Sequence, residues 1–155
     1  MRKKVLRITT VPVSFKLLKG QLNMLNRLYE VVAVSSPGKE LEEIGESEGV
    51  RTEAVSMERR IALVQDLKSL FALIWLIRKE KPWMVHTMTP KAGLLGMLAA
   101  WICKVPVRMH TFTGLVFPTA TGVKKHLLML TDRITCACAT FINPEGKGVR
   151  LEFNL

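Results

Sequence analysis

A histidine stands at the carboxyl end of an apolar run that is typical of a buried strand. The run is 105–111, and His110 lies one residue before its end. An imidazole has a pKa close to neutrality and can therefore serve as a general base. His86 ends the preceding apolar run, 84–86, in the same way. A core histidine satisfied by a neighbouring backbone group explains such a position equally well, so the pattern leaves both interpretations open.

The segment after His86 has the residues of a phosphate site. Thr87 and Met88 lead to Thr89, a good N-cap residue, and Pro90 suits the first position of a helix. Lys91 follows directly. Free amides at a helix N-terminus and a lysine beside them favour an anionic ligand. The alternative is that Lys91 is merely solvated and the glycines that follow serve packing.

The first loop of the chain, 11–16, lacks the glycines of a nucleotide site. A dinucleotide-binding loop needs GxGxxG between its strand and helix, but no glycine occurs before Gly20, and no P-loop occurs either. We therefore expect no bound cofactor. Phe15 and Lys16, at the end of this loop, are candidate substrate contacts.

These loops follow strands in a regular alternation of strands and helices. The apolar patterns and turn signals predict strands at 5–11, 31–34, 50–55, 84–86, 105–111 and 141–143, and helices at 17–28, 39–48, 61–81, 91–103 and 122–137. A further turn or helix is expected after residue 143. The long helix is apolar nearly all round from Leu67 to Ile77, so it packs on two faces or lies against something apolar outside the domain.

The alternation predicts the fold class. Short connections between strands and helices imply right-handed crossovers, so we expect an α/β, three-layer Rossmann-like domain. Its parallel sheet would have about six strands, with helices on both faces. Ligands bind beyond the carboxyl ends of the strands in such sheets, which directs attention to the loops 11–16, 86–91 and 110–121.

Composition narrows the possible partners. The net charge is +10 over 155 residues, which favours nucleic acid, anionic lipid or phosphorylated substrates. The sequence has three cysteines, Cys103, Cys136 and Cys138, an odd number, and no CxxC motif. We therefore expect buried, reduced thiols and no metal site. No run approaches the ~20 apolar residues of a spanning helix, and the N-terminus is no signal peptide. We expect a soluble or peripheral protein.

Several longer motifs resemble a known family. They are MERRI at 57–61, KPWMVHT at 81–87, TPKAGLLGMLAA at 89–100, and VPVRMHT at 105–111 followed by Gly114. Together they resemble the N-terminal domain of family 4, GT-B-fold glycosyltransferases, in particular those that build bacterial capsular and other surface polysaccharides. The resemblance extends from Val5 to about Gly148.

The resemblance implies a division of labour between two Rossmann-like domains. The N-terminal domain binds the acceptor, a saccharide that is expected to be lipid-linked. The C-terminal domain binds the nucleotide-sugar donor through a paired-glutamate motif. Residues 1–155 would then be the acceptor domain, with the donor domain outside this sequence, as expected for a cloned fragment or truncated reading frame, and inactive alone.

The same resemblance suggests roles for individual residues. Many members carry a histidine directly before the glycine that matches Gly114, whereas Thr113 stands here and the nearest histidine is His110. His110 and Thr113 are therefore the candidate catalytic residues. The candidate substrate-binding residues are Phe15, Lys16, His86, Thr87, Lys91, Thr111 and Gly114.

Two other functions remain as alternatives. A sugar-nucleotide epimerase shares the two-domain fold, but the three loops lack the carboxylates that its chemistry needs. A basic nucleic-acid-binding module lacks support from stacking aromatics, a recognition helix or zinc spacing, so no nucleic acid is expected. We expect a cytoplasmic protein, held peripherally at the inner face of the cytoplasmic membrane by contact with anionic lipid.

Overall fold

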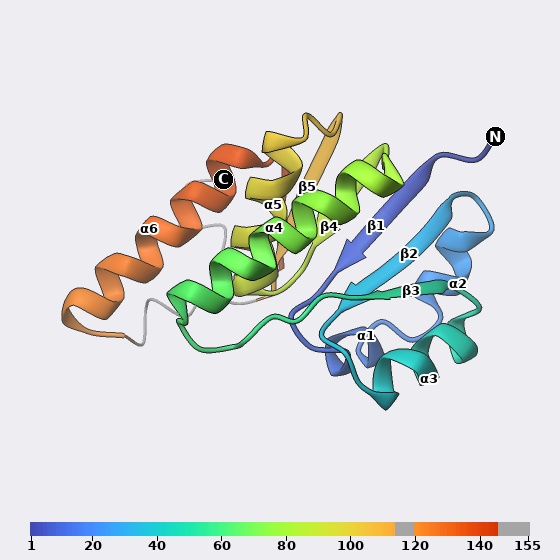
Figure 1. Ribbon diagram of the computed structural model, residues 1–155, viewed down its shortest axis with the longest axis horizontal. Helices are drawn as coiled ribbons and strands as arrows, with labels where there is room; N and C mark the ends of the chain where they lie inside the picture. Colours follow the sequence, from blue (N-terminus) through green and yellow to red (C-terminus); the bar gives the residue numbers. More distant parts are fainter. Residues whose placement is uncertain (114–119, 146–155) are drawn as a thin grey trace.

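The computed structural model describes residues 1–113 and 120–145 (Figure 1). Gly114 and the turn or helix expected after residue 145 lie outside the described residues. The elements are β1 (Lys4–Ile8), α1 (Val13–Lys16), α2 (Gln21–Asn26), β2 (Glu30–Ser35), α3 (Lys39–Glu48), β3 (Arg51–Ala54), α4 (Leu63–Glu80), β4 (Met84–Thr87), α5 (Pro90–Ile102), β5 (Val107–Phe112), α6 (Gly122–Cys138) and β6 (Phe141–Pro144).

The six described strands form one parallel sheet in the order β3-β2-β1-β4-β5-β6. Alternate residues of β2 face opposite sides, as a strand requires. Val32 and Val34 pack with α4 and α5, whereas Val31 and Ala33 pack with α1, α2 and α3. The expected three-layer Rossmann-like fold, with helices on both faces, is confirmed.

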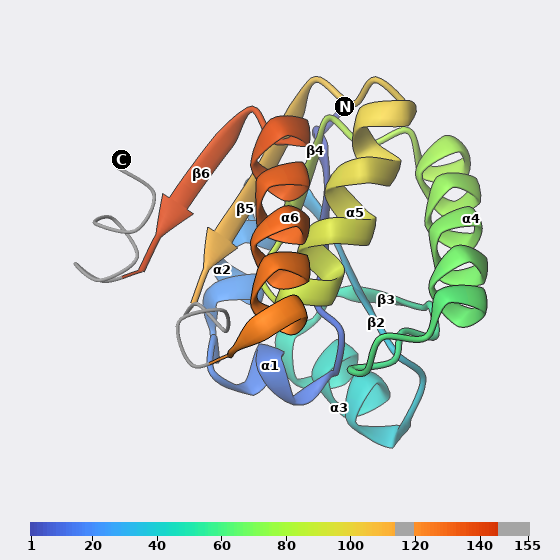
Figure 2. The same cartoon turned by 90° about the vertical axis from the view of Figure 1, so that its left-hand side faces the viewer.

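The two helical layers are unequal (Figures 1 and 2). Right-handed crossovers place α1 to α3 over the half of the sheet that holds β1 to β3. On the other face α4, α5 and α6 lie side by side, with α5 in the middle. The first turns of α6 extend beyond the sheet, and residues 121–127 are all exposed.

The helix expected over 17–28 is wrong as a single element. Within this segment only α2, Gln21–Asn26, is helical; residues 17–20 form a turn after α1, and Gly20 adopts a left-handed backbone with φ of 83° directly before α2. The carboxylate of Glu48, from α3, accepts hydrogen bonds from the backbone N–H groups of Gly20 and Asn23 at 2.8 and 3.0 Å. A cap supplied from a distant helix leaves no local pattern in the sequence.

Other boundaries shift by a few residues. β1 ends at Ile8. The N–H of Thr9 still donates to the carbonyl of Val34 at 3.0 Å, but the Thr9 hydroxyl donates to the carbonyl of Val11 in the turn that follows. β5 begins only at Val107, after Lys104 has turned the chain with φ of 55°.

The cysteines are unpaired, but only Cys138 is buried and the other two are half-buried. None of the described helices is long and apolar enough to cross a membrane.

Candidate active site at the carboxyl edge of the sheet

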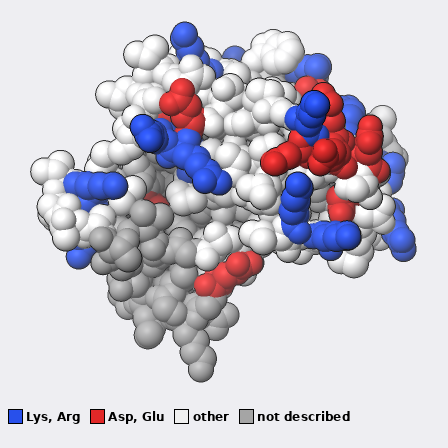
Figure 3. All heavy atoms as spheres, turned by 90° about the horizontal axis from the view of Figure 1, so that it is seen from below, with Lys and Arg blue, Asp and Glu red and all other residues white. Residues whose placement is uncertain are grey.

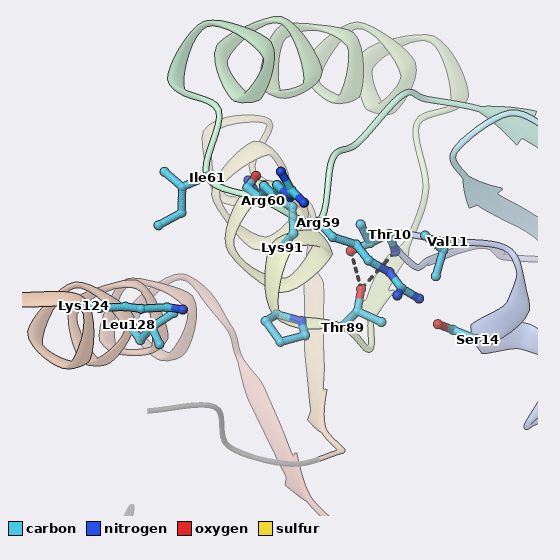
Figure 4. A pocket seen from close by; sticks show the side chains of 11 residues that line it. Thr10, Val11, Ser14, Arg59, Arg60, Ile61, Thr89, Lys91, Lys124 and Leu128 are labelled. Atoms are coloured by element: carbon cyan, nitrogen blue, oxygen red, sulfur yellow. Dashed lines mark hydrogen bonds between the residues drawn. The ribbon is translucent and has the colours of Figure 1, made fainter. Parts of the chain in front are cut away.

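The carboxyl ends of the strands border a cavity of about 710 Å³ (Figure 4). Its walls come from the β1–α1 loop, the loop before α4, the start of α5 and the first turns of α6. The lining residues are Thr10, Val11, Ser14, Arg59, Arg60, Ile61, Thr89, Pro90, Lys91, Lys124 and Leu128. Four of them are cations and none is a carboxylate.

The start of α5 is tied to β1 by hydroxyl groups. The hydroxyl of Thr89 accepts from the backbone N–H of Thr10 at 2.9 Å and bonds the Thr10 hydroxyl at 2.7 Å. The Thr10 hydroxyl in turn accepts from the N–H of Ala92. Thr89 and Pro90 occupy the cap and first helical positions as expected, but Thr10 rather than Thr89 bonds a helix amide. The amides of α5 are thus partly satisfied before any ligand binds.

Lys91 is committed to a protein partner. Its ammonium group lies 2.6 Å from a carboxylate oxygen of Asp66 and donates to the carbonyl of Arg60 at 2.8 Å. The other oxygen of Asp66 accepts from the N–H of Ala62. Lys91 and Asp66 therefore hold the loop 59–62 against α5, and the charge of Lys91, which the sequence assigned to a phosphate, is already neutralised.

The cations available to a ligand are Arg59, Arg60 and Lys124. Within residues 1–113 and 120–145 no carboxylate lies within ion-pair distance of these three side chains. Lys124 reaches from α6 towards the loop that carries both arginines (Figure 4). Seen from below the view of Figure 1, acidic side chains gather mainly on the side where α3 lies (Figure 3). Because these three cations are not paired with a described carboxylate, an anion is favoured at the cavity.

Sequence reasoning missed these three residues. The strand pattern directed attention to the loops after β1, β4 and β5 as ligand sites. The loop after β3 was not among them, although β3 ends at the same edge of the sheet. The paired arginines in that loop were the available signal. Lys124 carries no local signal, because its position depends on how α6 packs.

His110 lies inside the domain. Its side chain is 1% exposed, its Nδ1 lies 2.7 Å from the Thr87 hydroxyl, and its ring packs edge-on against Phe112. Gly93 of α5 lies so close to the ring that a Cβ at this position would clash with Cε1, Nδ1 and Nε2 of His110. Burial lowers the pKa of His110 to about 4, so the imidazole is neutral at pH 7.

His86 lies on the opposite face of the sheet from α5. Its Nε2 lies 2.8 Å from the hydroxyl of Thr111, and Asn143 also bonds this hydroxyl. Burial, with Arg7 nearby, lowers the pKa of His86 to about 3. His86 borders a second cavity of about 440 Å³, which Arg7 and Met84 also line.

The remaining predicted residues are dispersed. Thr87 and Thr111 are buried, Phe15 is a core residue beneath α3, and Lys16 borders a third hollow between α1 and α3. Thr113 is exposed just beyond the end of β5. Of the predicted residues that the structure describes, only Lys91 lies on the lining of the main cavity. The described residues hold no cluster of three or more His, Cys, Asp or Glu side chains suited to a metal ion.

The buried imidazoles predict a pH-dependent stability. Both have a folded-state pKa below the value of 6.5 for a free histidine, so the unfolded chain binds protons first as pH falls. Their stabilising contribution is complete above pH 6.5 and is lost towards pH 4, at about 1.4 kcal/mol per unit of pKa shift. We expect urea unfolding to show a free energy that falls over this range.

Replacement variants test the origin of that slope. His110→Gln and His86→Gln should each flatten the fall between pH 6.5 and 4.5. His126→Gln removes an imidazole from the exposed side of α6 and serves as the control. An unchanged slope in His110→Gln would contradict a neutral, buried His110.

The chain has clear relatives among known proteins. Residues 19–142 match the glycosyl transferase 4-like domain family. The chain is 41% identical over 140 residues to the capsular polysaccharide biosynthesis glycosyltransferase CapM of Staphylococcus aureus, covering 90% of this chain and 36% of CapM. Over 59 residues it is 46% identical to the UDP-Gal:alpha-D-GlcNAc-diphosphoundecaprenol alpha-1,3-galactosyltransferase of Escherichia coli, covering 38% of this chain and 15% of that enzyme.

Solved structures share the fold at lower identity. MurG of Acinetobacter baumannii superposes with a TM-score of 0.66 at 14% identity, covering 95% of this chain and 42% of MurG. The UDP-GlcNAc 2-epimerase of Neisseria meningitidis gives 0.66 at 16% identity, covering 98% and 43%. These likenesses concern the fold alone. The chain spans about a third of CapM, and by its sequence it belongs to the glycosyl transferase 4-like family.

Proposed function

We propose that this chain is the acceptor-binding half of a glycosyltransferase that acts in surface polysaccharide synthesis. The observation that carries the proposal is the cavity at the carboxyl edge, with Arg59, Arg60 and Lys124 free to meet an anion and no carboxylate among the described residues that line it. Such a site suits the diphosphate of a lipid-linked saccharide. The E. coli relative is named for an acceptor of this chemistry.

The nucleotide-sugar donor would be held by the part of the relatives' length that this chain does not span. The acceptor hydroxyl would lie beyond the end of β5, where Thr113 is exposed. Of the two catalytic candidates, His110 and Thr113, only Thr113 is exposed at this edge. His110 is 1% exposed and bonded to the Thr87 hydroxyl, which favours a structural role for it beneath α5.

The epimerase alternative finds no support in the cavity. Elimination and addition at a sugar carbon need a general acid and a general base. Asp66, whose carboxylate meets the lining residue Lys91 at 2.6 Å, is engaged in that ion pair and so is not free for proton transfer. We place the protein in the cytoplasm, at the inner face of the cytoplasmic membrane where a lipid-linked acceptor is found.

A titration tests the division between acceptor and donor. The isolated chain should bind UDP- and GDP-sugars no more tightly than about 1 mM, equivalent to about 4 kcal/mol, because the proposed division assigns the donor site to the part of the relatives that this chain does not span. Isothermal calorimetry with a panel of such donors measures this. Micromolar binding of any one donor would contradict the assignment of this chain to the acceptor side.

A further inference from the structure

A buried arginine stands in the middle of β1 without an anionic partner. Leu6 and Ile8 pack towards α4 and α5, so Arg7 between them points to the opposite face of the sheet, where α2 lies. The Arg7 side chain is 3% exposed, and its Nη2 donates to Oε1 of Gln21 at 2.9 Å and to Sδ of Met88 at 3.1 Å. A thioether is a weak acceptor. Among the described residues, Nε of Arg7 has no hydrogen-bond partner.

The charge of Arg7 is not compensated within the described part of the chain. No carboxylate of residues 1–113 and 120–145 lies within ion-pair distance of its guanidinium group. Burial lowers the pKa of Arg7 to about 10, which still leaves the group charged at pH 7. The neighbouring His86 is neutral, because burial and the charge of Arg7 lower its pKa to about 3. Since buried charges in proteins are normally paired, Arg7 lacks a counterion.

Arg7 and His86 line the cavity of about 440 Å³ on this face, which we name the Arg7 cavity. Its other polar lining residues are Gln21 and Asn143, and its apolar walls include three methionines. Apolar walls with a few polar groups, in a volume of roughly 300–1,000 Å³, are typical of small-molecule sites. None of the lining residues is shared with the cavity at the carboxyl edge. The Arg7 cavity is therefore a separate site.

We propose that the Arg7 cavity binds a small organic carboxylate with an apolar body. A carboxylate offers two acceptor oxygens and one negative charge, which match the planar guanidinium group and its unpartnered Nε–H. The apolar body would lie against the methionines and beside Tyr29 and Trp83, whose rings stack with centroids 6.1 Å apart. A phosphate dianion fits less well, because Arg7 is the only cation among the described lining residues. The inference does not rest on the proposed function.

Calorimetric titration of the 155-residue chain with benzoate, at constant ionic strength, tests the inference. Benzoate should bind with a Kd of about 1 mM or tighter. Benzamide has the same ring without the charge and should bind about tenfold more weakly or worse. Arg7→Met should weaken benzoate binding about tenfold or more, because the counterion of the carboxylate is removed. Arg27→Gln, which alters an exposed arginine directly after α2, is the matched control and should bind as the unaltered chain does.

Two further measurements separate lost binding from lost folding. Met109→Trp keeps Arg7 but fills the cavity, so it should weaken benzoate binding as Arg7→Met does. Without ligand, Arg7→Met should unfold at the same urea concentration as the unaltered chain or a higher one, because an unpaired buried charge is replaced by an apolar side chain.

Three results would overturn the inference: no binding of benzoate by the unaltered chain, equal affinity for benzamide, or benzoate binding that survives both Arg7→Met and Met109→Trp. Inorganic pyrophosphate that binds more tightly than benzoate, and is lost in Arg7→Met, would contradict the assignment of a carboxylate. Binding of an acceptor analogue at Arg59 and Arg60 is a separate result, which tests the proposed function.

Discussion

Gly93→Ala is expected to destabilise the domain by about 3 kcal/mol. A Cβ at Gly93 would clash with Cε1 of His110, and the ring cannot retreat because Phe112 and Thr87 hold its other sides. α5 must therefore move away from the sheet, or His110 must leave its hydrogen bond. Urea unfolding of the purified chain measures the loss.

A second substitution shows whether the clash is the cause. His110→Ala alone leaves a void and an unpaired Thr87 hydroxyl, at a cost of about 2–4 kcal/mol. In the double variant, Gly93→Ala with His110→Ala, the new methyl group enters that void. The loss of unfolding free energy should therefore be smaller than the sum of the two single losses by about 1–3 kcal/mol. Strict additivity would contradict the close packing of Gly93 on His110.

His110→Ala also separates the two interpretations of this residue, once it is made in a chain that includes the proposed donor domain. A general base predicts that kcat falls on the order of 10²-fold per folded molecule. Burial to 1% exposure predicts a lower melting temperature with the rate per folded molecule nearly unchanged. We expect the second result.

The sheet could be predicted because its signals are local. Apolar runs such as that of β2, closed by the turn at 35–38, identify strands directly, and alternation with helices implies parallel pairing. The acidic helix α3 was predicted with its observed bounds, since Gly49 at its end adopts the left-handed backbone of a C-cap. Where a group distant in the sequence determines the start of a helix, as the Glu48 carboxylate does for α2, prediction from sequence failed.

The candidate site was predictable in place but not in detail. Strand ends identified the edge, yet a residue's number does not say which way its side chain points. His110 and Thr87 point into the face covered by α5, and His86 points to the other face. Lys91 reaches the cavity, but Asp66, on a helix 25 residues earlier, neutralises it. Such pairings depend on packing between elements and leave no trace in local spacing.

Binding of a short-chain prenyl-diphosphate-linked monosaccharide by this chain is the most direct test of the proposed acceptor function. Arg59 and Arg60 each supply a charge-assisted contact, so Arg59→Gln with Arg60→Gln should weaken binding by about 100-fold. Lys39→Gln, an exposed charge at the start of α3, is the matched control and should bind as the unaltered chain does. Calorimetry measures all three affinities. Micromolar binding that is lost only in the arginine variant is the result we predict. No binding by the unaltered chain, or equal affinity after both arginines are removed, would contradict an acceptor site in this cavity.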